Sequence, residues 1–467
     1  MNINQDTICA LSTPSGSGAI GVIRLSGPKA IEIVNKRFKG KDLNLQKTQT
    51  LHFGSILKDE EIIDEVLISL FRAPHSYTGE DVIEISCHGS TYIIAQLLAL
   101  FIEDGARIAE AGEYTMRAFT NGKMDLAQAE AVADLIASES KAAHDIALNQ
   151  MRGGFSKKIM ELREELIHFT AMIELELDFA EEDVEFADRD DLKALVNRIL
   201  KMIRNLMASF ATGNVMKNGI PVAIIGQPNV GKSTLLNALL QEDKAIVSEI
   251  AGTTRDSIED EIKIGGMSFR FIDTAGIRET EDVVENIGIK RTFEMVDKAM
   301  IVLYLVDAIE ADQFNLKQMI DEIKKRIDGK DKELIILANK VDKGNFKSTE
   351  IPESIKNNFP DDIKTIYISA LKEERLEDLT DHLKTIAKSK MASGNQVVVS
   401  NARHYQALKN ADEALVRVQD GLTQNISGDF LAMDIRQAMH YLGEITGSIE
   451  IDRDILGHIF SSFCIGK

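Results

Sequence analysis

The chain has 467 residues and a formal net charge of −20, with 74 acidic against 54 basic residues. Apolar residues make up 44% of it, so it can bury substantial cores. Its length predicts roughly three domains. So acidic a surface repels phosphate backbones, which excludes a protein that holds nucleic acid mainly through its net charge.

Cysteine usage and the apolar runs favour a cytoplasmic protein without a membrane segment. The cysteines are Cys9, Cys87 and Cys464, an odd and sparse set that does not make a disulfide framework. The first residues, MNINQDTICAL, lack the basic start and long apolar stretch of a signal peptide. The apolar run Tyr92–Ile102 is far shorter than the ~20 residues that cross a bilayer, and predicts a core helix.

The first 120 residues predict a mixed α+β domain. Their strand-like segments are β-branched or alternating: Ile20–Leu25, Glu65–Phe71 and Asp81–Ser86. A helix is predicted over Ser90–Asp104. From Asp125 to about Gly213 glycine is scarce and apolar residues fall at helical spacing, which predicts a helical bundle in several pieces. The acidic stretch Glu174–Asp191 is either a solvated helix end and loop or an interaction patch.

From Gly219 the pattern changes to alternating strands and helices. Five apolar runs suit a parallel sheet: Pro221–Gly226, Ser268–Ile272, Met300–Asp307, Glu333–Asn339 and Thr365–Ser369. After about Leu383 helices return, predicted over Ala402–Gln419, Asp429–Thr446 and Ile451–Phe460. We therefore expect an N-terminal domain over 1–122, a helical domain in two parts over 123–216 and 384–467, and an α/β domain over 217–383 inserted between those parts.

A glycine-rich segment predicts a phosphate site in the α/β domain. Gly226-Gln-Pro-Asn-Val-Gly231-Lys232-Ser233 fits G-x-x-x-x-G-K-S, between a predicted strand and a helix over Thr234–Leu240. Glycines and a helix N-terminus direct backbone N–H groups at phosphates. Lys232 can reach the β- and γ-phosphates, and the Ser233 hydroxyl can hold Mg²⁺.

Three later segments complete the nucleotide site, and Asp342 in one of them selects GTP over ATP. Asp273 in Asp-Thr-Ala-Gly276 would hold Mg²⁺ through water, and the Gly276 N–H would contact the γ-phosphate. Asp342 of Asn339-Lys340-Val341-Asp342 can accept from the N1–H and amine of guanine, a donor pair that adenine lacks. Ser369-Ala370-Leu371 would supply a backbone N–H for the guanine carbonyl. Thr254 is the expected second Mg²⁺-holding residue, with Thr253 as the alternative.

GTP hydrolysis needs a group that orients the attacking water, and the residue that commonly does so is missing from this sequence. In Ras-like proteins a glutamine after D-x-x-G orients the attacking water, and this chain has Ile277 at that place. The segments around Gln227-Pro228-Asn229, Ala251–Asp256 and Asp273–Arg278, with the ending Phe463–Lys467, resemble the MnmE (TrmE) family of tRNA modification GTPases. The resemblance covers essentially the whole chain, including Arg117-Ala-Phe119 and Asp125–Glu130.

The resemblance implies a cation-dependent mechanism. K⁺ would lie beside the phosphates, held by Asn229, Ser248, Ile250 and Thr253, and would neutralise developing charge. Glu285 would place the water, and the catalytic set would be Glu285, Lys232 and Thr254. The G domains would dimerise across the nucleotide face. The full expected GTP-binding set is Asn229, Val230, Gly231, Lys232, Ser233, Thr234, Ser248, Glu249, Ile250, Ala251, Gly252, Thr253, Thr254, Asp273, Thr274, Ala275, Gly276, Asn339, Lys340, Asp342, Ser369 and Ala370.

The N-terminal domain resembles folate-binding one-carbon domains. By residue matching, 5-formyltetrahydrofolate or a related tetrahydrofolate would contact Arg24, Glu84, Lys123 and Lys467 at a dimer interface. A carboxylate such as Glu84 can read the N–H/NH₂ edge of a pterin, and cations suit the anionic folate tail. Cys464 is either a thiol that takes part in the modification or a small buried apolar residue. Ser90 departs from the family's glycine, which changes a turn.

The implied activity is modification of the C5 position of the wobble uridine of certain tRNAs. It would use a flavin- and NADH-dependent partner, MnmG (GidA), as a homodimer within a heterotetramer, with the tRNA held largely through that complex. GTP hydrolysis would drive a cycle between open and closed G domains. Two alternatives share the G motifs: a ribosome-assembly or other regulatory GTPase without modification chemistry, and a pure cation-sensing switch.

Overall fold

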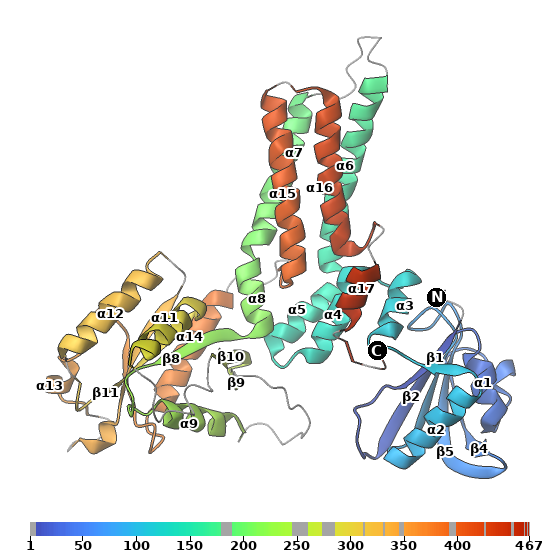
Figure 1. Ribbon diagram of the computed structural model, residues 1–467, viewed down its shortest axis with the longest axis horizontal. Coiled ribbons are helices and arrows are strands. Elements are labelled where there is room, and N and C mark those ends of the chain that lie inside the picture. The colour runs from blue at the N-terminus through green and yellow to red at the C-terminus, as the bar shows by residue number, and fades with distance from the viewer. Residues whose placement is uncertain are drawn as a thin grey trace. The chain divides into compact units, whose positions relative to one another are not determined.

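The chain forms two compact units in the computed structural model, which describes residues 6–178, 189–244, 260–272, 285–311, 313–329, 332–344, 350–391, 398–424, 426–449, 453–461, 463–464 and 466. Unit 1 consists of Met1–Ala137, Ala147–Ile203 and Gln406–Lys467, and unit 2 of Ser138–Ile146 and Arg204–Tyr405 (Figure 1). Most of unit 2 thus lies between two parts of unit 1 in sequence, as an inserted domain requires. The domain boundaries after 122, 216 and 383 stay predictions.

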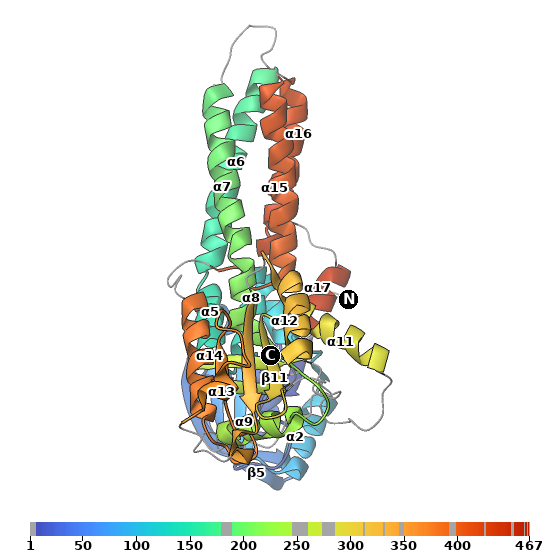
Figure 2. The same cartoon turned by 90° about the vertical axis from the view of Figure 1, so that its left-hand side faces the viewer.

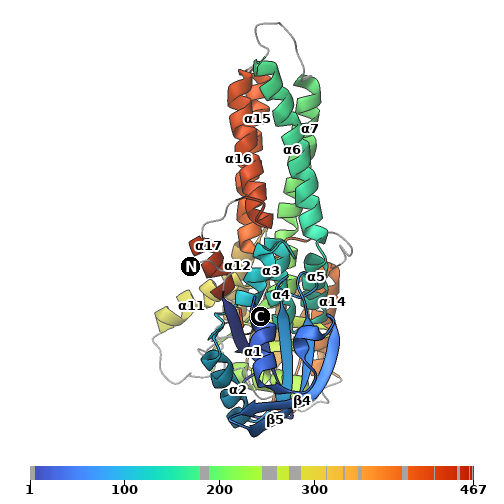
Figure 3. The ribbon, with the colours of Figure 1, turned by 90° about the vertical axis from the view of Figure 1, so that its right-hand side faces the viewer.

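Unit 1 begins with a seven-stranded sheet of order β3-β4-β5-β6-β2-β1-β7. The pair β1–β7 is parallel and the others are antiparallel. Helices α1 and α2 pack on one face, where alternate residues of β5 are buried, Val66, Ile68 and Leu70 among them (Figure 3). The elements are β1 (Thr7–Leu11), β2 (Ile20–Ser26), α1 (Ala30–Arg37), β3 (Phe38–Lys39), a 3₁₀ turn (Leu43–Leu45), β4 (Thr50–Lys58), β5 (Glu61–Phe71), β6 (Val82–His88), α2 (Thr91–Glu103), β7 (Ala106–Ile108) and α3 (Glu113–Thr120).

Helices follow, and four long ones, α6, α7, α15 and α16, run side by side (Figures 1 and 2). Ion pairs join neighbours: Arg198 to Glu165 between α7 and α6, and Arg417 to Asp434 between α15 and α16, each at 2.8 Å. The helices are α4 (Leu126–Ala137), α5 (Lys141–Met151), α6 (Gly154–Asp178), α7 (Arg189–Ala208), α8 (Phe210–Asn218), α15 (Ala402–Thr423), α16 (Gly428–Thr446) and α17 (Arg453–Ser461). Of these, α8 falls in unit 2, as do the first part of α5, the end of α7 and the start of α15.

Unit 2 is built on a six-stranded sheet of order β13-β12-β11-β8-β10-β9, in which β9 alone among the described strands runs antiparallel. Val222 and Ile224 of β8 pack on one face with α9 and α14, whereas Ala223 and Ile225 pack on the other with α11 and α12 (Figure 2). Burial on both faces explains the continuous apolar runs. The elements are β8 (Ile220–Ile225), α9 (Lys232–Lys244), β9 (Asp260–Ile264), β10 (Met267–Phe271), α11 (Glu285–Lys298), β11 (Ile301–Asp307), α12 (Gln313–Ile327), β12 (Glu333–Asn339), a 3₁₀ turn (Val341–Lys343), α13 (Glu353–Lys356), β13 (Thr365–Tyr367) and α14 (Leu376–Met391).

The structure confirms the predicted fold class: an N-terminal α+β part, helices on both sides in sequence, and an inserted α/β unit. The five predicted strands of the α/β unit correspond to β8, β10, β11, β12 and β13, all paired in parallel. The prediction missed β1, β3, β4, β7 and the antiparallel edge strand β9. In β4, His52 and Gly54 are buried and Phe53 is exposed, so its composition hides its alternation. Within the described residues, no helix combines the length and apolarity that a bilayer crossing needs.

Candidate functional site

The glycine-rich loop after β8 is held against the ends of two neighbouring strands. A Cβ added at Gly226, whose φ is +151°, would lie 2.3 Å from the Leu305 carbonyl oxygen of β11. A Cβ at Gly231, whose φ is +102°, would lie 2.4 Å from the side-chain nitrogen of Asn339. Both positions therefore require glycine, because any side chain would push the loop off the carboxyl edge of the sheet.

The Lys232 side chain contacts the backbone of the glycine-rich loop itself. The Lys232 ammonium donates to the carbonyl oxygens of Gly226 at 2.9 Å and Gln227 at 2.8 Å. Burial lowers the pKa of Lys232. Asn229 is exposed and adopts a left-handed backbone, φ 62°, which asparagine tolerates better than most residues. Ser233 and Thr234 lie in the first turn of α9 and are half-buried. Carbonyl partners of this kind can be exchanged for phosphate oxygens.

Asn339 ties the glycine-rich loop to the loop after β13. Its side-chain nitrogen donates to the Val230 carbonyl at 2.8 Å, and its side-chain oxygen accepts from the Ala370 N–H at 2.9 Å. Next to it, the Asp342 carboxylate accepts from the Ser369 hydroxyl at 2.7 Å. Three segments distant in sequence thus meet at the carboxyl edge of a parallel sheet, where open α/β sheets bind their ligands.

The N–H groups expected to contact guanine already have acceptors in the chain. Ala370 donates to Asn339, and Ser369 donates to the Glu374 carbonyl at 3.1 Å. The Ser369 hydroxyl also accepts from the Lys372 N–H at 3.2 Å. Hydrogen bonds within the chain therefore hold this loop without a bound base.

Several predicted residues cannot be placed. Glu285 is the first residue of α11, and its side chain lies outside the described residues. Also outside them are Ser248, Glu249, Ile250, Ala251, Gly252, Thr253, Thr254, Asp273, Thr274, Ala275, Gly276 and Lys467. Among the residues that the structure does describe, no group of three or more His, Cys, Asp or Glu side chains forms a metal cluster.

A second polar site lies on the N-terminal sheet, where Arg24 of β2 faces Glu84 of β6. Their side chains form an ion pair at 2.7 Å. The Arg24 guanidinium lies 5.5 Å from the ring centres of Tyr77 and Tyr114, and the Tyr114 hydroxyl donates to the Arg24 carbonyl at 2.7 Å. The Lys123 ammonium donates to the Pro74 carbonyl at 2.9 Å, on the loop that also carries Tyr77. Sequence reasoning missed both tyrosines, because nothing in sequence spacing relates them to Arg24.

The C-terminal tail reaches this second site. The Gly466 carbonyl accepts from Arg24 at 3.3 Å and from the Ser12 hydroxyl at 3.2 Å. Gly466 has φ +95°, and a Cβ there would lie 2.3 Å from the Leu11 carbonyl oxygen. The Cys464 carbonyl accepts from the Gly112 N–H at 3.4 Å, while the Cys464 side chain is exposed, so the expectation of a small buried apolar residue is wrong. The structure thus brings Arg24, Glu84 and the tail together.

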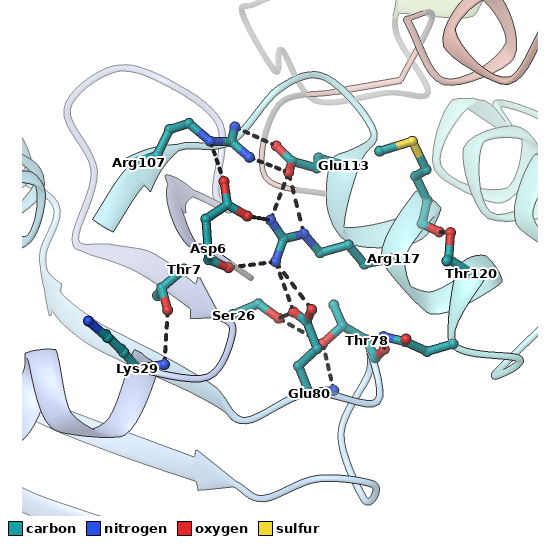
Figure 4. A network of polar contacts seen from close by, with 12 residues as sticks. Asp6, Thr7, Ser26, Lys29, Thr78, Glu80, Arg107, Glu113, Arg117 and Thr120 are labelled. Carbon is teal, nitrogen blue, oxygen red and sulfur yellow. Dashed lines mark hydrogen bonds and ion pairs between the residues drawn. The ribbon is translucent and has the colours of Figure 1, made fainter. Parts of the chain in front are cut away.

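A buried charge network supports the same domain (Figure 4). The Arg117 side chain is 0% exposed and pairs with Glu113 at 2.9 Å, Asp6 at 2.7 Å and Glu80 at 3.2 Å. Arg107 pairs with Asp6 at 2.8 Å and with Glu113 at 2.7 Å. Burial raises the pKa of Glu113, but the two arginines and the Glu110 N–H lower it more, so the net pKa is below its usual value. The network fixes α3 against the start of β1.

A glycine-rich loop between a parallel strand and a helix, joined through Asn339 to an Asn-Lys-x-Asp segment, defines a P-loop guanine-nucleotide hydrolase. Comparisons refine this class. A family model described as GTP-binding protein TrmE N-terminus matches residues 7–123, and one described as MnmE helical domain matches residues 126–464. The chain belongs to the MnmE family of tRNA modification GTPases.

Full-length relatives agree with the family models. The chain is 56% identical over 480 residues to a tRNA modification GTPase MnmE of Christiangramia forsetii, and 55% identical over 470 residues to one of Bacteroides thetaiotaomicron; each match covers 100% of both chains. Among solved structures, Aquifex aeolicus Era bound to GDP.AlF4⁻ is 29% identical, over 42% of this chain and 66% of that one, with a TM-score of 0.28.

Proposed function

We propose that the chain binds GTP with Mg²⁺ at the edge of the unit 2 sheet, hydrolyses it with help from K⁺, and couples hydrolysis to tRNA modification. The observation that carries the nucleotide site is the bridge made by Asn339. Its amide joins Val230 of the glycine-rich loop to Ala370 of the loop after β13. A phosphate site and a base site held at a fixed separation suit a nucleoside triphosphate, and the Asp342 carboxylate beside them suits guanine.

The residues around the phosphates fit the proposed cations. Ser233, with Thr254, would hold Mg²⁺, and a hydroxyl in the first turn of α9 is the oxygen donor such a hard cation takes. Asn229, with Ser248, Ile250 and Thr253, would hold K⁺, and the exposed Asn229 offers an amide oxygen. K⁺ supplies positive charge beside the phosphates when bound. We assign Glu285 to placing the attacking water, and Lys232 and Thr254 to the catalytic set.

For the modification chemistry we propose a tetrahydrofolate at the second polar site. Glu84 would read the pterin edge, Arg24, Lys123 and Lys467 would meet the anionic tail, and the Cys464 thiol would take part in the reaction. The Arg24–Glu84 ion pair and the two tyrosines support a site for a flat, charged ligand. The two groups must exchange at least part of their mutual pairing for the ligand.

The remaining parts of the proposal concern substrate and partners. The substrate would be the C5 position of the wobble uridine of certain tRNAs, modified in the cytoplasm with a flavin-dependent MnmG partner. The chain would act as a homodimer within a heterotetramer. Because its net charge is −20, the partner would hold most of the tRNA. The domain division at residues 122, 216 and 383 belongs to the same proposal.

Two measurements test this function. Calorimetry with GDP and ADP checks the base site: we expect binding of GDP and at most weak binding of ADP, and equal affinities would remove the nucleotide assignment. Mass spectrometry of tRNA nucleosides from a deletion strain checks the modification. Unchanged wobble uridines in that strain would favour the ribosome-assembly or regulatory GTPase instead.

A further inference from the structure

Asp307 ends β11, the strand between the strand of the glycine-rich loop and the strand of the Asn-Lys-x-Asp segment. Its backbone lies in register with Asn339 of β12, and the Ala308 N–H donates to the Asn339 carbonyl at 2.8 Å. Because β8, β11 and β12 are parallel neighbours, Asp307 lies at the centre of the ligand-binding edge. Asp307 is not among the residues assigned to the nucleotide site.

The two oxygens of the Asp307 carboxylate have different partners. Oδ1 accepts from the N–H groups of Ile309 at 3.0 Å and Glu310 at 3.3 Å, which fixes the carboxylate on the turn that follows the strand. Oδ2 lies 3.0 Å from the Lys340 ammonium, an ion pair by distance, and has no partner in hydrogen-bond geometry among the described residues. The side chain is 9% exposed for Asp307 and 24% for Lys340, so the pair is largely shielded from solvent. Little water therefore competes with this pair for either charge.

Lys340 is constrained at both ends. Its φ is 66°, a left-handed conformation that a lysine adopts only where its surroundings impose it. The preceding residue, Asn339, is hydrogen-bonded to Val230 and Ala370. The Lys340 ammonium is paired with Asp307. The long and otherwise flexible side chain is thus held at the carboxyl edge of the sheet, where Asn339 and Asp342 of the same segment contact Val230 and Ser369. A side chain that is already ordered loses less entropy when a ligand packs on it.

We propose that Asp307 is a positioning residue for guanine-nucleotide binding, and that it acts by fixing the side chain of Lys340 at the proposed base site. The proposal rests on the nucleotide site proposed above. Its competitor is a purely local role, in which Asp307 only caps the turn at Ile309 and Glu310. The two roles separate because Asp307→Asn keeps an oxygen for both N–H groups but removes the charge that holds Lys340.

A double-mutant cycle tests the proposal with the full-length protein and GDP as the probe, read by calorimetry and by the dissociation rate of a fluorescent GDP analogue. We expect Asp307→Asn to weaken GDP binding about tenfold, mainly through faster dissociation, as the loss of one ordered ion pair implies. In a Lys340→Met background the same substitution should change GDP affinity less than twofold. Asp362→Asn, which breaks the exposed Lys324–Asp362 ion pair of the same unit, is the matched control and should leave affinity unchanged.

Two results would overturn the proposal. One is GDP affinity within twofold of the parent for Asp307→Asn. The other is an equal loss in both backgrounds, which would mean that Asp307 acts without Lys340. A thermal melt of each variant identifies loss of folding, and a destabilised Asp307→Asn is compared with Asp307→Glu, which restores the charge and should recover affinity under the proposal. Failure of the parent protein to bind GDP would instead count against the proposed function.

Discussion

The Arg117 network in unit 1 and the Asn339–Asp342 segment in unit 2 are both polar clusters near strand ends, but their charged groups have different kinds of partner. Arg117 is fully buried and meets three carboxylates of the chain itself. Asp342 is only half-buried, and the described contact of its carboxylate is a neutral hydroxyl. Lys232 likewise rests on two backbone carbonyls. The Arg117 cluster thus has its counter-charges within the chain, whereas Asp342 and Lys232 contact neutral groups that a ligand can replace.

The largest expected effect on turnover lies on the ligand side of this comparison. Glu285→Ala should lower GTP turnover on the order of a hundredfold or more, because it removes the group assigned to the attacking water, while GDP affinity is kept. Single-turnover kinetics with calorimetry in parallel measures both. The matched control is Glu294→Ala, an exposed acid on the same helix, which should keep parental turnover. A parental rate in Glu285→Ala would remove its assigned role.

Substitutions in the Arg117 network should lower the stability of the fold and leave GTP turnover unchanged. Arg117→Met removes the counter-charge of Glu80 and one of the two arginines that Asp6 and Glu113 share, which costs about 3–5 kcal/mol of unfolding free energy. Arg198→Met removes an exposed arginine from its pair with Glu165 and should cost about 0–1 kcal/mol. Urea unfolding of both variants makes the comparison. Equal losses would mean that the Arg117 network is no more stabilising than a surface pair.

Replacing potassium by sodium sharpens the contrast, since it alters a proposed ligand and leaves the internal network intact. We expect GTP turnover to fall about tenfold or more, because the smaller Na⁺ fits the oxygens of a K⁺ site poorly and the charge beside the phosphates is then lost from the transition state. The salts are compared at equal ionic strength so that screening is constant. The midpoint of urea unfolding serves as the control and should not differ between them. Equal turnover in both salts would contradict the cation mechanism.

Acid should weaken the Arg117 network selectively. Burial raises the pKa of Asp6 and of Glu113, but their arginine partners lower each of them more, so both are below their usual values. The stabilisation is therefore complete above the ordinary carboxyl pKa near ~4 and is lost as pH falls through the lowered folded-state value. The stability difference between the parent and Arg117→Met should therefore shrink between neutral pH and about pH 3. An unchanged difference in urea unfolding would argue against these carboxylates as the source.

The smallest effect is expected at the tail. Gly466→Ala places a Cβ against the Leu11 carbonyl and should loosen the tail, so that a maleimide labels Cys464 about twofold to fivefold faster. Cys9 and Cys87 are buried and should label slowly. Gly122→Ala is the control, because Gly122 also has a positive φ, +68°, but nothing lies within 4 Å of its added Cβ. Equal labelling rates in both variants would show that the Gly466 contact does not hold the tail.

Local sequence was enough to predict the α/β unit, because its strands are buried on both faces and read as continuous apolar runs between helical segments. The glycine-rich loop was equally predictable, since its glycines and lysine stand at the fixed spacing of a phosphate-binding motif. The close contacts that require glycine at 226 and 231 come from Leu305 and Asn339, which are distant in sequence. The strands β4 and β9 were missed because one carries buried His52 and Gly54, and the other is a charged edge strand.

The sequence by itself determined the fold class, the nucleotide motif and the family, since each depends on residue types at short, fixed spacing. Only the tertiary structure decided which groups meet across the chain: Arg24 with Glu84 and Gly466, Asn339 with Val230 and Ala370, and Asp307 with Lys340. Such pairings depend on strand order and register, which bring together residues that no local pattern relates.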